Sequence, residues 1–216
     1  MEGNRKKFIL GILVLMTVVI FGIVGYYIYE NTYYVGTEDA KITGDFVKVA
    51  PESTGKVIEL FMEEGQMVQE NQILGRIDSA NSTDAAIEQS LIRAPISGIV
   101  VKKQGNAGEI LSTAQVVGYL VDPNKLYITA NIEETKLSNV KLGQAVNISV
   151  DQFKGVNFKG NVISIGHASA AAFSLLPSST GSFTKTVQKI PVKIGIEKSN
   201  KSLLPGTNAV IKIHIK

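Results

Sequence analysis

Two stretches of the chain carry the same pattern: KVAPESTGKVIELFMEEGQMVQENQILGRID at Lys48–Asp78 and LIRAPISGIVVKKQGNAGEILSTAQVVGYLVD at Leu91–Asp122. Glycines recur 43 residues apart, in the pairs Gly55/Gly98, Gly65/Gly108 and Gly75/Gly118. Apolar residues keep the same offset in the pairs Val68/Leu111, Ile73/Val116 and Ile77/Leu120. A register kept over about 30 residues indicates an internal repeat.

Each half of the repeat has the composition of short strands. Aliphatic and β-branched residues such as Val57 are separated by turn formers such as Glu64-Gly65 and Asn71. One half alone buries little apolar surface, so we expect the halves to pack as face-to-face sheets around a shared core. The pattern resembles the lipoyl/biotinyl domain, here over residues 47–122, with halves 47–78 and 91–122.

The connector between the halves, residues 79–90, argues against a carrier function. A lipoyl or biotin carrier attaches its cofactor as an amide to a lysine in the turn that joins its halves. The connector reads SANSTDAAIEQS, and no lysine occurs between Lys56 and Lys102. The sequence therefore predicts the lipoyl-like fold with no cofactor.

An uncharged segment, FILGILVLMTVVIFGIVGYYIY, runs from Phe8 to Tyr29. Its 22 residues would form a helix of roughly 33 Å, enough to cross a hydrocarbon core about 30 Å thick. The alternative is a cleaved signal peptide, whose apolar region is usually about 7–15 residues long. The greater length and the tyrosines at its end favour an uncleaved anchor over residues 8–29.

The charges beside this segment predict its direction. Arg5, Lys6 and Lys7 precede it, so we expect residues 1–7 to be a cytoplasmic tail and the rest of the chain to lie outside the cytoplasm. The chain has 22 basic and 19 acidic residues, and removing these three and Glu2 leaves 19 and 18. This near-neutral remainder offers no basic stripe for nucleic acid.

The C-terminal part, residues 123–216, has the alternation of half-buried strands. The expected strands are Lys125–Asn131, Ala145–Val150, Phe158–Ile165, Lys189–Ile196 and Asn208–Ile215. Short strands separated by glycines predict a small antiparallel β-barrel. The expected fold is therefore mainly β: an N-terminal transmembrane helix, a linker and entry strand at 30–46, a split lipoyl/biotinyl-like β-sandwich (barrel-sandwich hybrid) and a small barrel.

Three stretches together resemble the HlyD/EmrA-type membrane fusion proteins, or periplasmic adaptors. YVGTEDAKI at Tyr34–Ile42 is similar to the family's T-x-D-A-x-V strand, which leads into the lipoyl half. The split repeat is the second stretch. The third, FSLLPSSTGSFTKTVQKIPVKI at Phe173–Ile194, resembles the EmrA-type signature. The resemblance implies a non-catalytic adaptor that self-associates and assists a polytopic exporter, of the major-facilitator type for EmrA.

One departure from the family concerns the connector. In longer relatives an α-helical coiled-coil hairpin separates the lipoyl halves and reaches toward an outer-membrane channel. Here 12 residues join them, which as a helix would span roughly 18 Å. We therefore expect a short form without direct contact with an outer-membrane channel. Both a single-membrane host and a shortened or engineered chain would explain it.

The sequence offers no catalytic or metal-binding constellation. There are no cysteines, and His167 and His214 have no acidic or histidine partner at metal-ligand spacing. We expect no enzyme activity, no metal and no cofactor.

The segment at 166–183 is apolar but lacks strand alternation. It is either a surface loop or a patch that docks on the exporter or on a neighbouring adaptor. The residues of that patch would be Phe173, Leu175, Leu176 and Phe183.

Two other functions compete with that of an adaptor for a major-facilitator exporter. One keeps the adaptor role with an ABC-type exporter of peptides or toxins. The other is an extracytoplasmic sensing or cell-wall-binding module.

Overall fold

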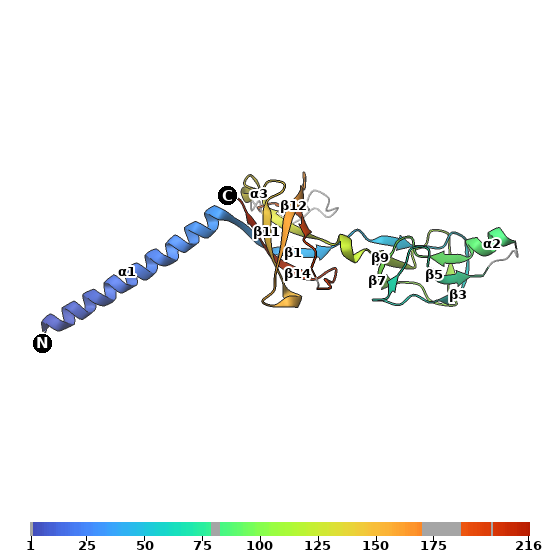
Figure 1. The fold of residues 1–216 in the computed structure, drawn as a ribbon, viewed down its shortest axis with the longest axis horizontal. Helices are drawn as coiled ribbons and strands as arrows, with labels where there is room; N and C mark the ends of the chain where they lie inside the picture. Colours follow the sequence, from blue (N-terminus) through green and yellow to red (C-terminus); the bar gives the residue numbers. More distant parts are fainter. Residues whose placement is uncertain (1, 79–82, 170–186, 200) are drawn as a thin grey trace, which may run out of the picture. The chain divides into compact units, whose positions relative to one another are not determined.

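A computed structural model describes residues 2–78, 83–169, 187–199 and 201–216, with side chains from residue 11 onward (Figure 1). The fold is mainly β after one long helix, which confirms the predicted fold class. The elements in chain order are α1 (Glu2–Tyr33), β1 (Tyr34–Thr43), β2 (Val47–Val49), β3 (Gly55–Leu60), β4 (Met67–Val68), β5 (Ile73–Ile77), α2 (Asp84–Gln89), β6 (Leu91–Arg93), β7 (Gly98–Lys103), β8 (Ile110–Leu111), β9 (Gly118–Val121), η1 (Pro123–Lys125), β10 (Tyr127–Glu133), α3 (Glu134–Leu137), β11 (Ala145–Val150), η2 (Asp151–Phe153), β12 (Asn157–Ile165), β13 (Lys189–Ile196) and β14 (Asn208–His214).

The repeat forms a sandwich of two four-stranded sheets, ordered β2-β9-β7-β4 and β6-β5-β3-β8. We expected each half to form one sheet, but each sheet takes strands from both halves. The pairing registers repeat as the sequence does: Val57 lies opposite Ile77, and Val100, 43 residues after Val57, lies opposite Leu120. The two halves therefore share one interlocked core, in which residues of both are buried.

The repeated glycines explain why the pattern is so regular. A Cβ atom on Gly55 would lie 2.5 Å from the carbonyl oxygen of Asp78, and one on Gly98 would lie 2.3 Å from that of Val121. These two positions therefore admit only hydrogen. Gly65 and Gly108 have φ angles of 84° and 88°, which L side chains rarely adopt. The same backbone constraints thus recur in both halves.

The second sheet system is a closed barrel with the strand order β1-β10-β13-β12-β11-β14. Its inner face follows the alternation read from the sequence, as in β11, where Val146, Ile148 and Val150 are buried and the residues between them are exposed. The predicted strands at 145–150 and 189–196 have the same bounds in the structure. The other three predicted strands differ from the observed ones by one or two residues at their ends.

The segment 30–46 differs from the linker and entry strand that we expected. The helix continues to Tyr33, and β1 follows at Tyr34 as a strand of the barrel, antiparallel to β14. A bulge between Thr37 and Ala40 changes the register of this pairing. The bulge breaks the alternation of β1, so the sequence pattern alone did not reveal a barrel strand.

The chain accordingly divides into two compact units. One comprises residues 1–41, 128–197 and 207–216, and the other comprises 42–127 and 198–206. The expected division into 47–122 and 123–216 was contiguous along the chain. The observed units are not contiguous: the barrel unit includes β1, which precedes the sandwich in the sequence, and the sandwich unit includes residues 198–206.

Candidate functional site at the junction of the helix and the barrel

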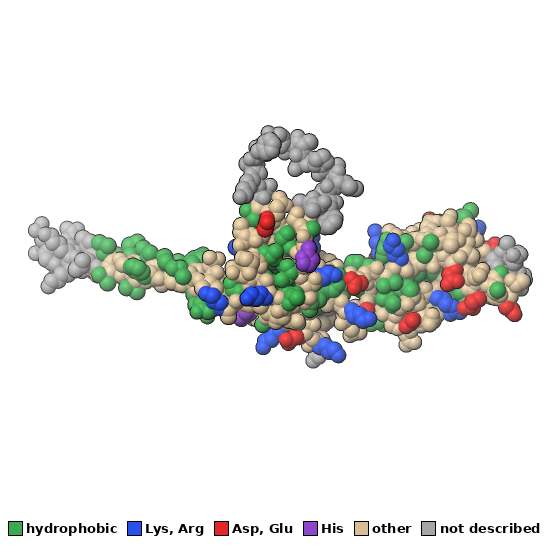
Figure 2. Space-filling view, turned by 90° about the horizontal axis from the view of Figure 1, so that it is seen from above, with side chains coloured by type: hydrophobic (Ala, Val, Ile, Leu, Met, Phe, Trp, Pro, Cys, Tyr) green, Lys and Arg blue, Asp and Glu red, His purple; other side chains and the backbone are tan. Residues whose placement is uncertain are grey.

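Helix α1 exposes its apolar side chains all along its described length (Figure 2). Phe21 is 72% exposed and Leu15 is 65% exposed. The part from Gly11 to Tyr33 is long and apolar enough to cross a membrane, and none of it is buried against the rest of the chain. Such a surface is unfavourable in water, so it indicates a lipid environment. The helix extends past Phe8 and Tyr29, the expected ends of the anchor.

The end of α1 is attached directly to the barrel. The Lys212 ammonium donates to the Glu30 carboxylate, and the Ile215 amide donates to the Tyr33 carbonyl at 3.0 Å. The ring of Tyr34 contacts that of His214, with centroids 4.6 Å apart. No linker separates the helix from β1, since α1 ends at Tyr33 and β1 begins at Tyr34.

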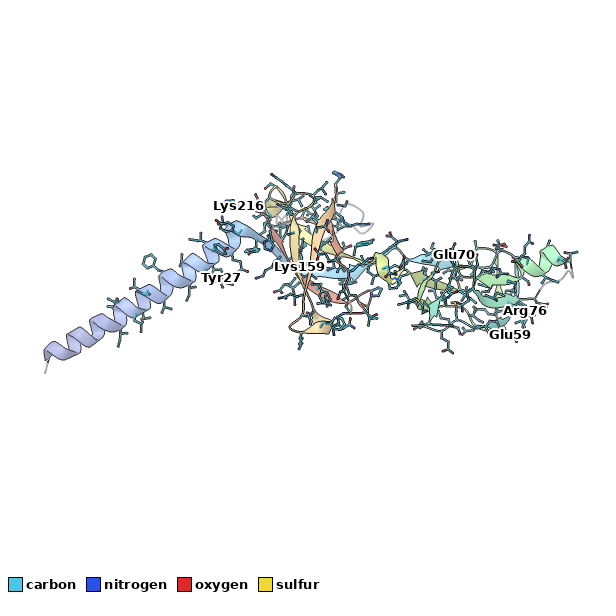
Figure 3. All side chains as sticks on the ribbon, viewed as in Figure 1. Tyr27, Glu59, Glu70, Arg76, Lys159 and Lys216 are labelled. Carbon is cyan, nitrogen blue, oxygen red and sulfur yellow. The ribbon has the colours of Figure 1, made fainter. Side chains whose placement is uncertain are left out.

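A cavity of about 550 Å³ lies at this junction. Figure 3 labels Tyr27, one of its lining residues, on the part of α1 next to the barrel. The lining includes polar and charged groups from α1, from the barrel strands β1 and β14, and from α3 with the residues after it. Its residues are Tyr27, Glu30, Asn31, Tyr34, Val35, Gly36, Thr135, Lys136, Asn139 and Lys212. We call it the junction cavity.

An ion pair joins two of the sequence motifs on an adjacent part of the barrel. The Lys189 ammonium, at the start of β13, donates to Asp39 Oδ2 of β1 at 2.7 Å. Asn131 of β10 donates to Asp39 Oδ1 at 3.2 Å. Asp39 belongs to the motif at 34–42 and Lys189 to the signature at 173–194, so residues 150 positions apart meet at one point.

The two ion pairs shift the pKa of the Asp39 carboxyl and of the Lys212 ammonium. The hydrogen bond from Lys189 lowers the pKa of the Asp39 carboxyl, against the opposing effect of partial burial. The hydrogen bond to Glu30 raises the pKa of the Lys212 ammonium. The Asp39 carboxyl and the Lys212 ammonium therefore keep their charges at neutral pH. Neither ion pair includes a nucleophile with a neighbouring base, so we assign both a structural role. The Asp39–Lys189 pair joins barrel strands, and the Glu30–Lys212 pair joins α1 to β14.

The structure places the other predicted residues as follows. Arg5, Lys6, Lys7 and Phe8 lie within α1, and their side chains are not among those described. The expected docking residues Phe173, Leu175, Leu176 and Phe183 lie outside the described residues. Their role is therefore still a prediction.

The histidines and acids of the described residues form no group of three or more that would hold a metal ion. His214 contacts Asn147 at 3.0 Å, in addition to the Tyr34 ring. Residues 83–90 of the connector include α2, with Thr83 accepting a hydrogen bond from the Ala86 amide. Sequence reasoning missed the junction cavity, because no pattern relates the elements that line it.

Comparison with known proteins agrees with this architecture. Residues 45–123 match the family model described as RND MFP, barrel-sandwich hybrid domain, and residues 126–213 match the YknX-like beta-barrel domain. YhbJ of Bacillus subtilis (strain 168), named as a putative efflux system component, is 33% identical over 186 residues, which cover 85% of this chain and 81% of YhbJ. The chain belongs to the membrane fusion protein family.

The chain is also similar to a longer relative and to a solved adaptor structure. EmrK of Escherichia coli (strain K12), named as a probable multidrug resistance protein, is 32% identical over 129 residues, which cover 58% of this chain and 33% of EmrK. The chain thus matches only about a third of that longer relative. The solved structure of the periplasmic adaptor protein EmrA shares the fold, with a TM-score of 0.62, 15% identity, and coverage of 85% of this chain and 99% of that one.

The family assignment confirms the predicted resemblance and the predicted role of an efflux adaptor. Membrane fusion proteins are adaptors and are generally not enzymes. The apolar helix and the family membership indicate single-pass anchoring in a membrane. Adaptors of the EmrA type work with a polytopic exporter.

Proposed function

We propose that this membrane fusion protein is the adaptor of a polytopic multidrug exporter of the major-facilitator type. Similarity to EmrK and EmrA, which are named for multidrug resistance and export, supports the class of exporter. The direct attachment of α1 to the barrel carries the proposed placement of the adaptor. Because β1 follows the helix without a linker, a helix inserted beside the exporter would hold the barrel at the membrane surface, where transported molecules emerge. The protein itself catalyses no reaction in this proposal.

The partner can be identified by purifying the tagged full chain in mild detergent and sequencing what copurifies. A 14-helix transporter supports the proposal. An ATPase-linked transporter would instead make the chain an adaptor of an ABC-type exporter of peptides or toxins. Purification without any transporter would favour an extracytoplasmic sensing or cell-wall-binding module.

The orientation that we propose places the N-terminus in the cytoplasm and both β units outside. It rests on Arg5, Lys6 and Lys7 before the apolar segment. The chain has no cysteine, so a single one can be introduced on either side of the apolar segment. A membrane-impermeant maleimide should label Lys154→Cys in intact cells and should label Asn4→Cys only after lysis. The reverse pattern would contradict the orientation.

Docking on the exporter, or on a neighbouring adaptor, is assigned to Phe173, Leu175, Leu176 and Phe183. Changing Phe173, Leu175 and Leu176 to Ser should abolish exporter-dependent drug resistance while expression and folding are retained. Leu142→Ser is the matched control, since Leu142 is an apolar side chain of the barrel unit that is 66% exposed. Unchanged resistance in the triple variant would contradict the assignment.

We also propose that the chain forms homo-oligomers through its sandwich unit. Met67 and Ile110, which are equivalent in the repeat, lie on the terminal strands of the two sheets and are 61% and 72% exposed. Replacing both with Glu should convert the oligomer to a monomer in analytical ultracentrifugation. The connector of 12 residues supports a role at a single membrane, without direct contact with an outer-membrane channel.

A further inference from the structure

Placing Phe8 at the inner edge of the hydrocarbon core brings the junction cavity to the depth of the lipid headgroups. The 20 residues from Phe8 to Tyr27 span about 30 Å of helix, which matches the hydrocarbon core. Glu30 lies about 4.5 Å beyond Tyr27 along the helix axis. The headgroup layer on each side of the core is about 5–7 Å thick, so the α1 residues that line the cavity fall within it.

The lining carries charges of both signs. Lys136 and Lys212 are the two cations among its residues, and Glu30 is the anion. An ammonium has three donors, so Lys212 can bind Glu30 and still donate to a ligand. Lys136 likewise contacts Glu133 at 3.0 Å through one of its donors. The cations therefore remain able to bind a phosphate.

The other polar residues of the lining can contact the rest of a zwitterionic headgroup, which carries an ammonium as well as a phosphate. The side-chain amides of Asn31 and Asn139 form no hydrogen bond within the described part of the chain, so they can donate to a phosphate or an ester oxygen. The Glu30 carboxylate can accept from an ammonium, and Tyr27 and Tyr34 are aromatic residues of the same lining, a residue type that attracts cations. The C-terminal end of α1 also carries partial negative charge, which favours a cation there.

We propose that the junction cavity binds the headgroup of an aminophospholipid such as phosphatidylethanolamine, with the phosphate on Lys136 and Lys212 and the ammonium on Glu30. The volume of about 550 Å³ is in the range of small-molecule sites, about 300–1,000 Å³. The acyl chains would run along the apolar surface of α1. A mixed-charge lining favours a zwitterion with a primary ammonium over an anionic headgroup or the bulkier choline.

The test is native mass spectrometry of the detergent-solubilised full chain with added lipids. The lipids share dioleoyl chains and differ in the headgroup: phosphatidylethanolamine, phosphatidylglycerol, phosphatidylcholine and, without phosphate, dioleoylglycerol. Phosphatidylethanolamine should bind most strongly, and dioleoylglycerol should bind least. Equal binding of all four lipids would show that α1 recognises only acyl chains, and a preference for phosphatidylglycerol would show an anion site. Either result would overturn the proposal.

Substitutions of the lining residues test whether those residues bind the lipid headgroup. Lys136→Gln with Lys212→Gln should weaken phosphatidylethanolamine binding at least about tenfold, since charge-assisted hydrogen bonds are the strong ones. Glu30→Gln should reduce the preference for phosphatidylethanolamine over phosphatidylglycerol to about one, because the ammonium contact is lost together with the Glu30–Lys212 pair, while both lysines remain to bind the phosphate. Lys159→Gln is the matched control, because Lys159 is an exposed lysine on β12, three strands from β1 in the barrel (Figure 3).

Two further measurements separate a lipid site from a loss of folding and from a site for free phosphate. Lys136→Gln alone leaves the Glu30–Lys212 pair intact, so unchanged lipid binding with an unchanged melting temperature would overturn the proposal. Inorganic phosphate at millimolar concentration should not displace the lipid, and displacement would show that the cavity binds free phosphate instead. The inference requires α1 in a bilayer but no particular exporter, so it and the proposed function can fail independently.

Discussion

The sandwich and the barrel are both small β structures, but their strands are brought together in different ways. In the sandwich, one pattern of glycines and aliphatic residues occurs twice, and both copies meet in one core. In the barrel, β1 pairs with β14, and Tyr34 lies opposite His214, 180 residues later. The first arrangement is visible as a repeat in the sequence. The barrel depends on pairing between strands that are far apart in the sequence, and no local sequence pattern predicts that pairing.

The prediction with the largest expected effect tests whether equivalent glycines in the two halves of the repeat are equally intolerant of a side chain. Gly98→Val should destabilise the sandwich by about 3 kcal/mol or more, because the new side chain would collide with the Val121 carbonyl. Gly55→Val should be as severe, since its Cβ would approach Asp78 in the same way. Thermal unfolding followed by circular dichroism would measure both. Lys102→Val, at an exposed position of β7, is the control, and a large difference between the two glycine variants would contradict the equivalence.

The prediction with the next largest effect tests whether the stability of the barrel is independent of that of the sandwich. Ile211 is fully buried in β14, between the neighbouring strands β1 and β11. Ile211→Ala should cost the barrel about 2–4 kcal/mol by leaving a cavity, and it should leave the sandwich unchanged. Hydrogen exchange with mass spectrometry would show faster exchange in the barrel strands alone. Ile163→Ala, at a side chain 49% exposed on β12, is the control. Faster exchange in both units would show that their stabilities are coupled.

A smaller effect concerns one position where the halves differ. Asn71 and Ala114 are 43 residues apart, and both have a φ angle of 64°. Asn tolerates this conformation better than Ala does. Ala114→Gly should therefore stabilise the sandwich by about 0.5–1 kcal/mol, whereas Asn71→Ala should destabilise it. Urea unfolding would measure both. Ala145→Gly, in strand β11, is the control and should not stabilise the barrel.

The smallest effect concerns the ion pair of the barrel. Asp39 and Lys189 are both partly exposed, so a double-mutant cycle with Asp39→Asn and Lys189→Gln should give a coupling of about 0.5 kcal/mol. The pKa of Asp39 is lowered in the folded state. The stabilisation is therefore complete above the unfolded pKa of about 3.9, and it is lost as the pH falls through the lower folded value. A coupling that does not decrease as the pH falls below the unfolded pKa, or when salt is added, would contradict an electrostatic interaction between Asp39 and Lys189.

The sequence allowed the sandwich, the anchor and most barrel strands to be predicted, because each has a local signal. The repeated glycines mark backbone positions where a side chain cannot fit, and β11 alternates without interruption. The sequence did not reveal which strands pair with one another to form each sheet. The interleaving of the halves follows from side-chain packing across sheets, and the place of β1 in the barrel was concealed by the bulge after Thr37.

The site was less predictable than the fold. Asp39 and Lys189 were within motifs recognised from the sequence, but nothing in either motif indicated that they meet. The residues that line the junction cavity come from α1, β1, β14 and the region of α3, and they have no common spacing. Such a site arises only when the end of the helix and the rim of the barrel are both in place.

The strands at the entry and the exit of the sandwich also bear on the order of folding. Val47 of β2 pairs with Leu120 of β9, so a folded sandwich holds its two ends together. Closing the barrel around an unstructured insertion of this length would carry a large loss of chain entropy. Once the sandwich has folded, β1 and β10 are joined by a short closed connection instead of a long flexible loop. We therefore expect the sandwich to fold first and to speed the closure of the barrel that encloses it in the sequence.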